Sequence, residues 1–361
     1  MQLSKIITGA MRLKDRKSGV ATLRAAIDAG FNYIDTSPCY CFKDENENSE
    51  SWVGDAVSDP DYRARVMVST KCAPGDGGFG LGEFRPRNGF GVRGVEQFRQ
   101  VFDQSLRRLG LDQLDFYHLW TTHTDEQFNA AMQPGSWYDG LQSKKDQWNH
   151  VGITTHAEPN TVIRFLESGR FETVTIPLNV INTMRLPVVD YCREHGIEVI
   201  AMNPLAGGFL AARDDMKELA LRYLMLLDGV HPLIGFSSPE EVAYAKWIED
   251  TMPSWELGAD EILKKVSGMM TSDEPRCTAC GYCSPCPESI TVGAALSYYN
   301  AYKYLGMKEA KEAFNCKQWE AGLRLDNCVE CGECETRCPN NLPVREIIRD
   351  ARKLLYDEAA K

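Results

Sequence analysis

Eight of the 13 cysteines lie in two tight runs near the C-terminus, and a proline follows each run. The second run has the spacing C-x2-C-x2-C-x3-C-P that wraps a [4Fe–4S] cubane, and the first is one residue shorter in its last gap. Two such runs predict two clusters, with the cysteine before proline commonly binding the cluster of the other run. The predicted ligands are Cys277, Cys280, Cys283, Cys286, Cys328, Cys331, Cys334 and Cys338.

Zinc is the alternative metal for any CxxC pair. Cysteine-rich zinc sites use two separated pairs, whereas these cysteines form two sets of four, so the spacing favours iron–sulfur clusters. The segment between the runs has a helical pattern, which predicts an α-helical ferredoxin module. Cys316 lies between the runs without a partner at this spacing, and we expect it to be a buried residue.

A second group of reactive side chains follows short apolar runs earlier in the chain. Asp35 and Tyr40 follow one run, Lys71 ends the next, and His118 lies within a third. Each alone has a structural explanation, such as a helix cap or a buried histidine. Together, an acid, a phenol, an amine and an imidazole at the carboxyl ends of consecutive strands can converge on one point, where a barrel keeps its catalytic groups.

The elements that would position these side chains alternate between apolar, β-branched runs and amphipathic helical patterns, which indicates βα units. Eight units over roughly 250 residues predict an α/β fold, a closed (β/α)8 TIM barrel. A doubly wound open sheet is the alternative, but the Gly-rich turn GxGxxG that it usually carries is absent from the sequence. The predicted strands are residues 5–11, 32–36, 65–71, 114–120, 151–155, 173–179, 198–205 and 231–236.

The pattern becomes helical and cysteine-rich near residue 252. We therefore predict a barrel domain over residues 1–251 and a mostly helical iron–sulfur domain over residues 252–361. Residues 72–94, which hold eight glycines, and residues 121–147 read as loops on the working face of the barrel. These loops would select the substrate.

The overall composition is that of a globular protein, with 43% hydrophobic and 25% charged residues. The formal net charge of -11 argues against binding to nucleic acid or an anionic membrane, which leaves small molecules and other proteins as partners. No apolar run approaches the roughly 18 residues of a membrane helix, and the N-terminus does not resemble a signal peptide. With CxxC motifs as metal ligands, this predicts a reducing, cytoplasmic location.

The segments NYIDTSPCY, VSTK and LDFYHLW resemble the three that supply the Asp, Tyr, Lys and His tetrad of the aldo-keto reductases. GAMR (9–12), GITTH (152–156), NPLAGG (203–208) and IGFSSPEEV (234–242) follow in the order of that family. The resemblance covers about residues 5–250, and the tail resembles the subgroup with a C-terminal ferredoxin-type domain. It implies a barrel oxidoreductase that acts on carbonyl and alcohol groups with a nicotinamide.

The resemblance also implies a role for each tetrad residue. Reducing a carbonyl by hydride places charge on its oxygen, so Tyr40 would donate a proton there. Lys71 would lower the pKa of this phenol by stabilising the phenolate, and Asp35 would keep Lys71 charged and oriented. His118 would orient the substrate oxygen or assist proton transfer. Run backwards, the same set would oxidise an alcohol.

Family positions that contact the nicotinamide cofactor carry unusual residues in this chain. Thr154 and Thr155 replace a Ser-Asn pair, Thr175 replaces a Gln, and Met202 replaces a stacking aromatic. Where NADPH-preferring members place a Lys and an Arg, we align Gly235 and Glu241, and a carboxylate would repel the 2′-phosphate, so NADH is favoured over NADPH. The complete predicted cofactor set is Gly9, Met11, Thr154, Thr155, Thr175, Met202, Pro204, Leu205, Gly235, Ser237, Ser238 and Glu241.

Further side chains near the predicted site have open roles. Cys39, Cys41 and Cys72 flank Tyr40 and Lys71 and are either buried structural residues or a redox or metal group. His123 and His156 are candidates for substrate contact. Aromatic residues in the same region would suit a sugar or polyol, because their faces and polar edges both serve carbohydrates. They are Trp120, Trp137, Tyr138 and Trp148.

The leading functional hypothesis is a nicotinamide-dependent carbonyl reductase or alcohol dehydrogenase. Its two [4Fe–4S] clusters would relay electrons to a redox partner such as ferredoxin or a flavoprotein. A second hypothesis keeps the clusters purely structural. A third treats the barrel as a lyase or isomerase that uses Tyr40 and Lys71 as acid and base, and a fourth makes the chain a non-catalytic binding subunit.

Overall fold

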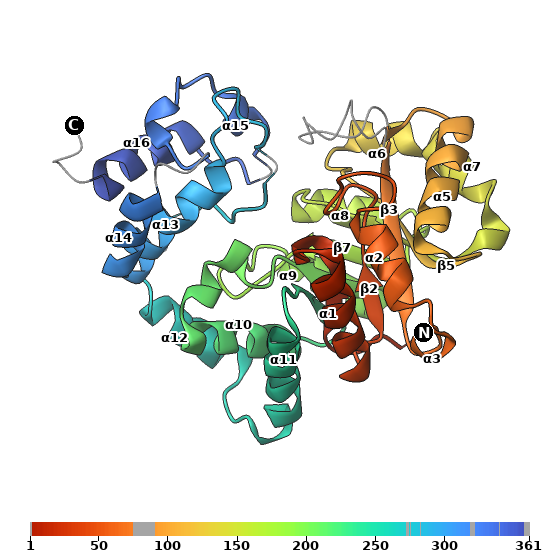
Figure 1. Ribbon diagram of the computed structural model, residues 1–361, viewed down its shortest axis with the longest axis horizontal. Helices are drawn as coiled ribbons and strands as arrows, with labels where there is room; N and C mark the ends of the chain where they lie inside the picture. Colours follow the sequence, from red (N-terminus) through yellow and green to blue (C-terminus); the bar gives the residue numbers. More distant parts are fainter. Residues whose placement is uncertain are drawn as a thin grey trace.

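The computed structural model describes residues 2–74, 91–271, 274, 276–281, 283–317, 322–338 and 340–356. Within them, eight parallel strands pair in the order β2-β1-β9-β8-β7-β6-β5-β3, and β2 also pairs with β3, which closes a barrel (Figure 1). The strands are β1 (Ile7–Gly9), β2 (Tyr33–Asp35), β3 (Met67–Pro74), β5 (Leu114–Leu119), β6 (Trp148–Thr154), β7 (Thr173–Pro177), β8 (Glu198–Met202) and β9 (Val230–Gly235). A short strand, β4 (Gly91–Val92), pairs with the end of β3. All eight predicted strands are present, so the predicted (β/α)8 barrel is confirmed and the open sheet is wrong.

Helices cover the outside of the barrel because their apolar faces pack on the strands, as Phe98 and Phe102 of α5 do on Tyr117. They are α1 (Arg16–Asp28), α2 (Ser49–Ala56), α3 (Pro60–Arg63), α5 (Val95–Leu109), α6 (Asp125–Met132), α7 (Trp137–Gln142), α8 (Pro159–Leu166), α9 (Leu186–His195), α10 (Asp214–Leu226) and α11 (Pro239–Thr251). Short 3-10 helices are η1 (Ala10–Arg12), η2 (Lys145–Gln147), η3 (Ala206–Gly208), η4 (Leu210–Ala212), η5 (Met252–Ser254) and η6 (Leu325–Asn327).

The predicted loop 121–147 is instead largely helical, since it contains α6, α7 and η2. Thr124 caps α6 through a capping box with Gln127, which fixes the start of this helix. Most of the other predicted loop, residues 75–90 of the range 72–94, lies outside the described residues.

Inside the barrel, side chains form layers because alternate residues of a strand point to the same face. Tyr33 and Phe116 pack edge to face with ring centroids 5.0 Å apart, beside Ile7 and Ile200. Two residues further along their strands come Asp35 and His118. An apolar layer therefore lies directly beneath the layer that holds charged and polar groups.

The C-terminal part is mostly helical. It consists of α12 (Ala259–Gly268), which packs on α10, followed by α13 (Val292–Leu305), α14 (Lys308–Lys317), α15 (Glu333–Thr336) and α16 (Val344–Leu355). The last four form the lobe drawn in blue at one side of the barrel (Figure 1). Helix α11 ends at Thr251, next to the predicted boundary at residue 252, and the boundary itself stays a prediction. No helix in the described ranges is long and apolar enough to cross a membrane.

Candidate active site

A buried ion pair joins two of the predicted catalytic residues. Lys71 on β3 places its Nζ 2.5 Å from Oδ2 of Asp35 at the end of β2, and the two side chains are only 2% and 6% exposed. Both charges are removed from water, so each depends on the other for compensation. The strand order brings them together, because β2 and β3 are the pair that closes the barrel.

Tyr40 lies in the loop after β2, and its ring centroid is 5.0 Å from the Lys71 ammonium. The loop is fixed at this point by the Tyr40 amide, which donates to the Ser37 carbonyl, and by an edge-to-face contact of the ring with Trp120 at 6.3 Å. The phenol, the ammonium and the carboxylate of the predicted tetrad therefore lie within one cluster.

The pKa of Tyr40 is raised well above its ordinary value, first by burial and then by the charge of Asp35. This corrects the expectation that Lys71 lowers it. The physical reason is that Asp35 compensates the ammonium at close range, so desolvation of the phenolate dominates. The phenol is consequently held in its protonated, proton-donating form.

His118 on β5 is fully buried, and strand pairing places it opposite Lys71 on β3. Its Nε2 lies 3.0 Å from the Tyr33 hydroxyl and its Nδ1 lies 3.4 Å from the Thr154 hydroxyl. Burial, followed by the Lys71 charge, lowers the pKa of His118 to about 3, so the ring is neutral. The sequence interpretation missed Tyr33, although its place two residues before Asp35 puts both side chains on the inner face.

The predicted cofactor residues lie at the same end of the barrel as the tetrad. Strand pairing aligns Gly9 with Gly235 and Thr154 with Thr175, Met202 ends β8, and the remaining residues follow β1, β6, β8 and β9. Glu241, in the first turn of α11, accepts hydrogen bonds from the amide of Ser237 at 2.7 Å and from its hydroxyl at 2.9 Å. Binding of a nicotinamide by this set stays a prediction.

The three cysteines around the tetrad are protonated thiols in packed surroundings. Burial raises the pKa of Cys39 and Cys72 to about 12 each, and it raises the pKa of Cys41 as well. Cys72 also accepts a hydrogen bond at its sulfur from Nε1 of Trp137 at 3.1 Å. Since thiolates are the reactive and metal-binding form, the raised pKa values and these contacts favour a structural role for the three cysteines.

In the C-terminal lobe, cysteines of the two runs are near enough to affect one another's pKa. Burial raises the pKa of Cys277 and Cys283 to about 12, and nearby sulfurs add to both shifts, among them Cys338 from the second run. Cys338 precedes a proline and is near the first run, as expected if the cysteine before each proline binds the cluster of the other run. The donor set therefore suits iron–sulfur clusters.

Two further observations concern this donor set. Within the described ranges no three His, Cys, Asp or Glu side chains are close enough to hold a single metal ion. Cys316, which we expected to be buried, is exposed in α14. The expectation was wrong because Phe314 and Ala310 supply the buried face of that helix.

One loop of the barrel is in direct contact with the first cysteine run. Nδ2 of Asn203 donates to the Thr278 carbonyl at 3.3 Å, and its Oδ1 accepts from the Gly207 amide at 2.5 Å. A side chain at Gly207 would collide with Thr278 and Ala279. This loop, residues 203–208, includes the predicted cofactor residues Pro204 and Leu205, so the first cysteine run packs against the expected nicotinamide site.

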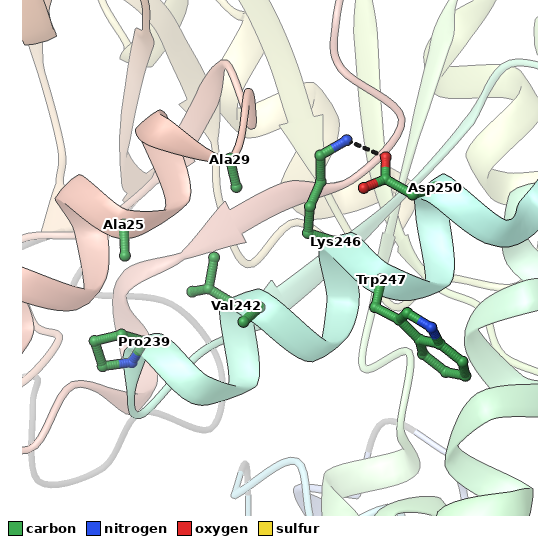
Figure 2. Close-up of a pocket in the computed structure, with 8 residues that line it drawn as sticks. Ala25, Ala29, Pro239, Val242, Lys246, Trp247 and Asp250 are labelled. Carbon is green, nitrogen blue, oxygen red and sulfur yellow. Dashed lines mark hydrogen bonds and ion pairs between the residues drawn. The ribbon is translucent and has the colours of Figure 1, made fainter.

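A separate hollow of about 370 Å³ lies on the outside of the barrel between α1 and α11 (Figure 2). Lys246 and Asp250 form an ion pair at its edge, with 2.5 Å between Nζ and Oδ1. The hollow contains none of the tetrad residues. Its lining residues are Ala25, Ala29, Pro239, Val242, Ala243, Lys246, Trp247 and Asp250.

The fold and the site together define a class, a (β/α)8 barrel joined to a helical iron–sulfur domain. Residues 5–218 match the model of the Aldo/keto reductase family, and residues 276–343 match that of a 4Fe-4S dicluster domain. The chain belongs to the aldo/keto reductase family.

Two curated relatives illustrate the range of the family. An NADH-specific methylglyoxal reductase of Escherichia coli is 26% identical over 199 residues, which cover 54% of this chain and 59% of that protein. L-galactose dehydrogenase of Arabidopsis thaliana is 30% identical over 201 residues, 53% of this chain and 56% of the relative. The first matches thus span about 60% of the relatives' own length.

Solved structures support the fold. The holo form of an aldo-keto reductase from Bacillus halodurans superposes with a TM-score of 0.58 at 21% identity, covering 74% of this chain and 93% of that one. An aldo-keto reductase from Klebsiella pneumoniae in complex with NADPH gives a TM-score of 0.56 at 21% identity, covering 74% and 90%. At this identity the likeness concerns the barrel fold.

Proposed function

We propose that this chain interconverts a carbonyl and an alcohol by hydride transfer with a nicotinamide cofactor, and that its two [4Fe–4S] clusters relay electrons to a redox partner such as ferredoxin or a flavoprotein. The observation that carries the proposal is the buried Lys71–Asp35 pair with the Tyr40 ring 5.0 Å from the ammonium, at the carboxyl end of the barrel. A protonated phenol beside a fixed cation is the donor that a reduced carbonyl oxygen requires.

When bound, the nicotinamide supplies the hydride and the clusters supply one-electron transfer. The chain's own residues donate the proton and stabilise the negative charge that develops. Tyr40 donates its hydroxyl proton to the developing alkoxide, and Lys71 stabilises the phenolate that results. Asp35 holds Lys71 in place, and the neutral His118 orients the substrate oxygen.

The relatives support this assignment from two sides. The Escherichia coli relative is named as a methylglyoxal reductase, and the Arabidopsis thaliana relative as an L-galactose dehydrogenase. A carbonyl compound, including one derived from a sugar, is therefore a reasonable substrate class for this chain. We place the protein in the reducing cytoplasm, where the cluster thiolates would be protected from oxidation.

The direct test is anaerobic reconstitution, measurement of iron and sulfide, and a visible spectrum before and after adding NADH or NADPH. Bleaching of the cluster absorbance by one nucleotide would support the electron relay and identify the cofactor, and turnover of a carbonyl with that nucleotide would support hydride transfer. A holoprotein that binds neither nucleotide and reduces no carbonyl with either would contradict the proposal and favour the lyase or isomerase hypothesis.

A second candidate function keeps the clusters structural. It is favoured by the contact of Asn203 with Thr278, because a rigid domain docked on the barrel could serve only to brace the loop at residues 203–208. Redox titration followed by electron paramagnetic resonance separates the two. Clusters that NADH cannot reduce, in a protein that still turns over carbonyls, would establish the bracing role.

Glu241→Gln is expected to raise kcat/KM with NADPH about 5- to 50-fold and to change the value with NADH little. The Glu241 carboxylate is fixed by Ser237 where the 2′-phosphate would lie, and like charges at close range cost on the order of 1 to 2 kcal/mol near a surface. Steady-state kinetics with both nucleotides measures the change. Glu249→Gln, at the far end of α11, is the control, and an equal response of both variants would contradict the assignment.

The pH profile of carbonyl reduction is expected to be flat from about pH 5 to 8. The pKa of His118 is lowered to about 3, so its ring stays neutral in this range, and the raised pKa of Tyr40 keeps the phenol protonated. The rate should fall only at alkaline pH, where the phenol ionises. A change of kcat/KM centred near pH 6.5 would contradict this expectation. If that change disappears in His118→Gln, this histidine titrates during turnover.

A further inference from the structure

A buried arginine with incomplete hydrogen bonding lies beyond the tetrad. Arg185, the residue before α9, is 1% exposed. Its Nε donates to the Ala157 carbonyl at 3.1 Å and its Nη2 donates to the His156 carbonyl at 2.6 Å. Its Nη1 has no hydrogen-bond partner among the described residues. Two contacts therefore fix the plane of the guanidinium and leave one nitrogen available.

The charge of Arg185 lacks a direct counter-charge within the part of the chain that the structure describes. Glu158 acts on it only through space, and desolvation outweighs this effect, which lowers the pKa of Arg185 to about 10. A guanidinium buried without an ion pair is costly. Such a group is typical of a site that receives an anion from outside the chain.

The surroundings of Arg185 add neutral polar groups. The rings of His123 and His156 are 5.6 Å apart, edge to face. Burial lowers the pKa of His123 to about 4 and that of His156 well below its ordinary value, with Arg185 contributing to both shifts. The guanidinium is therefore close to both imidazoles, which remain uncharged at neutral pH.

The two residues before His123 are also unusual. Thr121 and Thr122 are buried, and their hydroxyls have no hydrogen-bond partner in the described ranges. Thr121 has a φ of +56, in the left-handed region that a threonine rarely adopts. Strain of this kind in a loop that bears polar groups is common where a ligand is bound.

This polar cluster is continuous with the catalytic residues. Trp120, which contacts the Tyr40 ring, immediately precedes Thr121, and Thr154, which contacts His118, precedes Thr155. The Thr155 hydroxyl lies 3.5 Å from Nδ1 of His123. The cluster and the tetrad thus share the carboxyl ends of the neighbouring strands β5 and β6.

We propose that Arg185, together with His123, His156 and the Thr121 hydroxyl, binds a carboxylate carried by the carbonyl substrate. The substrate class is then a short oxo acid, or the corresponding hydroxy acid in the oxidative direction. This rests on the proposed function. A carboxylate matches the single charge of one guanidinium, whereas a phosphate would bring nearly two negative charges against one buried cation.

The test is calorimetric titration of the reconstituted holoprotein, without and with saturating NAD⁺. The probes are pyruvate, its neutral analogue methyl pyruvate, and dihydroxyacetone phosphate. Pyruvate is expected to bind at least 10-fold more tightly than methyl pyruvate. Arg185→Met should weaken pyruvate binding about 10- to 100-fold. Methyl pyruvate binding should stay unchanged, because the ester has no carboxylate to pair with Arg185.

Arg213→Met is the matched control, because Arg213 pairs with Asp215 outside this cluster, and it should change neither affinity. Arg185→Lys, which keeps the charge, covers the case in which the Met variant fails to fold, and it should retain part of the preference for pyruvate. Equal affinities for pyruvate and its ester in the native protein would overturn the proposal. So would absence of pyruvate binding in both conditions, or tighter binding of dihydroxyacetone phosphate.

These outcomes are separable from the fate of the proposed function. Turnover of a neutral carbonyl with NADH, combined with no preference for pyruvate, would contradict the proposed carboxylate site and leave the reductase assignment standing. A preference for pyruvate that depends on Arg185, in a protein without nicotinamide turnover, would remove the reductase assignment and keep the anion site.

Discussion

Tyr40→Phe is expected to lower kcat for carbonyl reduction about 100- to 10,000-fold, the range over which a positioned proton donor acts. The phenyl ring can keep the packing on Trp120 and the position near the Lys71 ammonium, so only the hydroxyl is lost. Steady-state kinetics on protein of matched iron content measures the effect. The dissociation constant for NADH, measured by fluorescence, should change less than about threefold, because the hydroxyl acts in the transition state.

Tyr62→Phe is the matched control for this experiment. Tyr62 donates its hydroxyl to Asp28 on the outside of the barrel and is stacked by Arg24 and Arg65, so its loss should leave kcat unchanged. A Tyr40→Phe variant that retains its rate within about threefold would place the proton donor elsewhere. In that case His118 or a water molecule would be the next candidate for the proton donor, and the role assigned to Tyr40 would be wrong.

The positions of the tetrad could be predicted from the sequence because they depend on regular features. Side chains alternate along a strand, parallel strands end at the same edge, and the eight runs close a barrel, so Asp35, Lys71 and His118 had to converge. The same alternation places Tyr33 beneath Asp35. The direction of the Tyr40 pKa shift could not be predicted, because it depends on the balance between burial and the Lys71–Asp35 pair.

Features that depend on long-range docking were also beyond the sequence. Arg185 lies in a loop with no motif, and its role depends on the carbonyls of His156 and Ala157 about 30 residues earlier in the chain. From local geometry, the cysteine spacing predicts eight cluster ligands, and this set stays a prediction. The spacing carried no information about which barrel loop the first run would contact, and that contact involves Gly207 and Asn203.

Gly207→Ala is expected to separate the first cysteine run from the barrel. Gly207 has a φ of +68, and an added Cβ would collide with the Thr278 carbonyl and with Ala279. The left-handed conformation alone costs a non-glycine residue about 1 to 3 kcal/mol, and the collision adds to this. The iron–sulfur domain should therefore lose its fixed position and release its clusters several-fold faster to a chelator, which the decay of visible absorbance would measure.

Gly208→Ala is a control matched to this variant. Gly208 also has a positive φ, of +101, but no atom lies within 4 Å of the place a Cβ would take. Both variants thus carry backbone strain and only Gly207→Ala carries the collision, so equal rates of cluster loss would refute the docking role. If the clusters exchange electrons with the nicotinamide site through residues 203–208, NADH should bleach them more slowly in Gly207→Ala than in Gly208→Ala. A relay that is intact in both variants would mean that electrons do not cross at this contact.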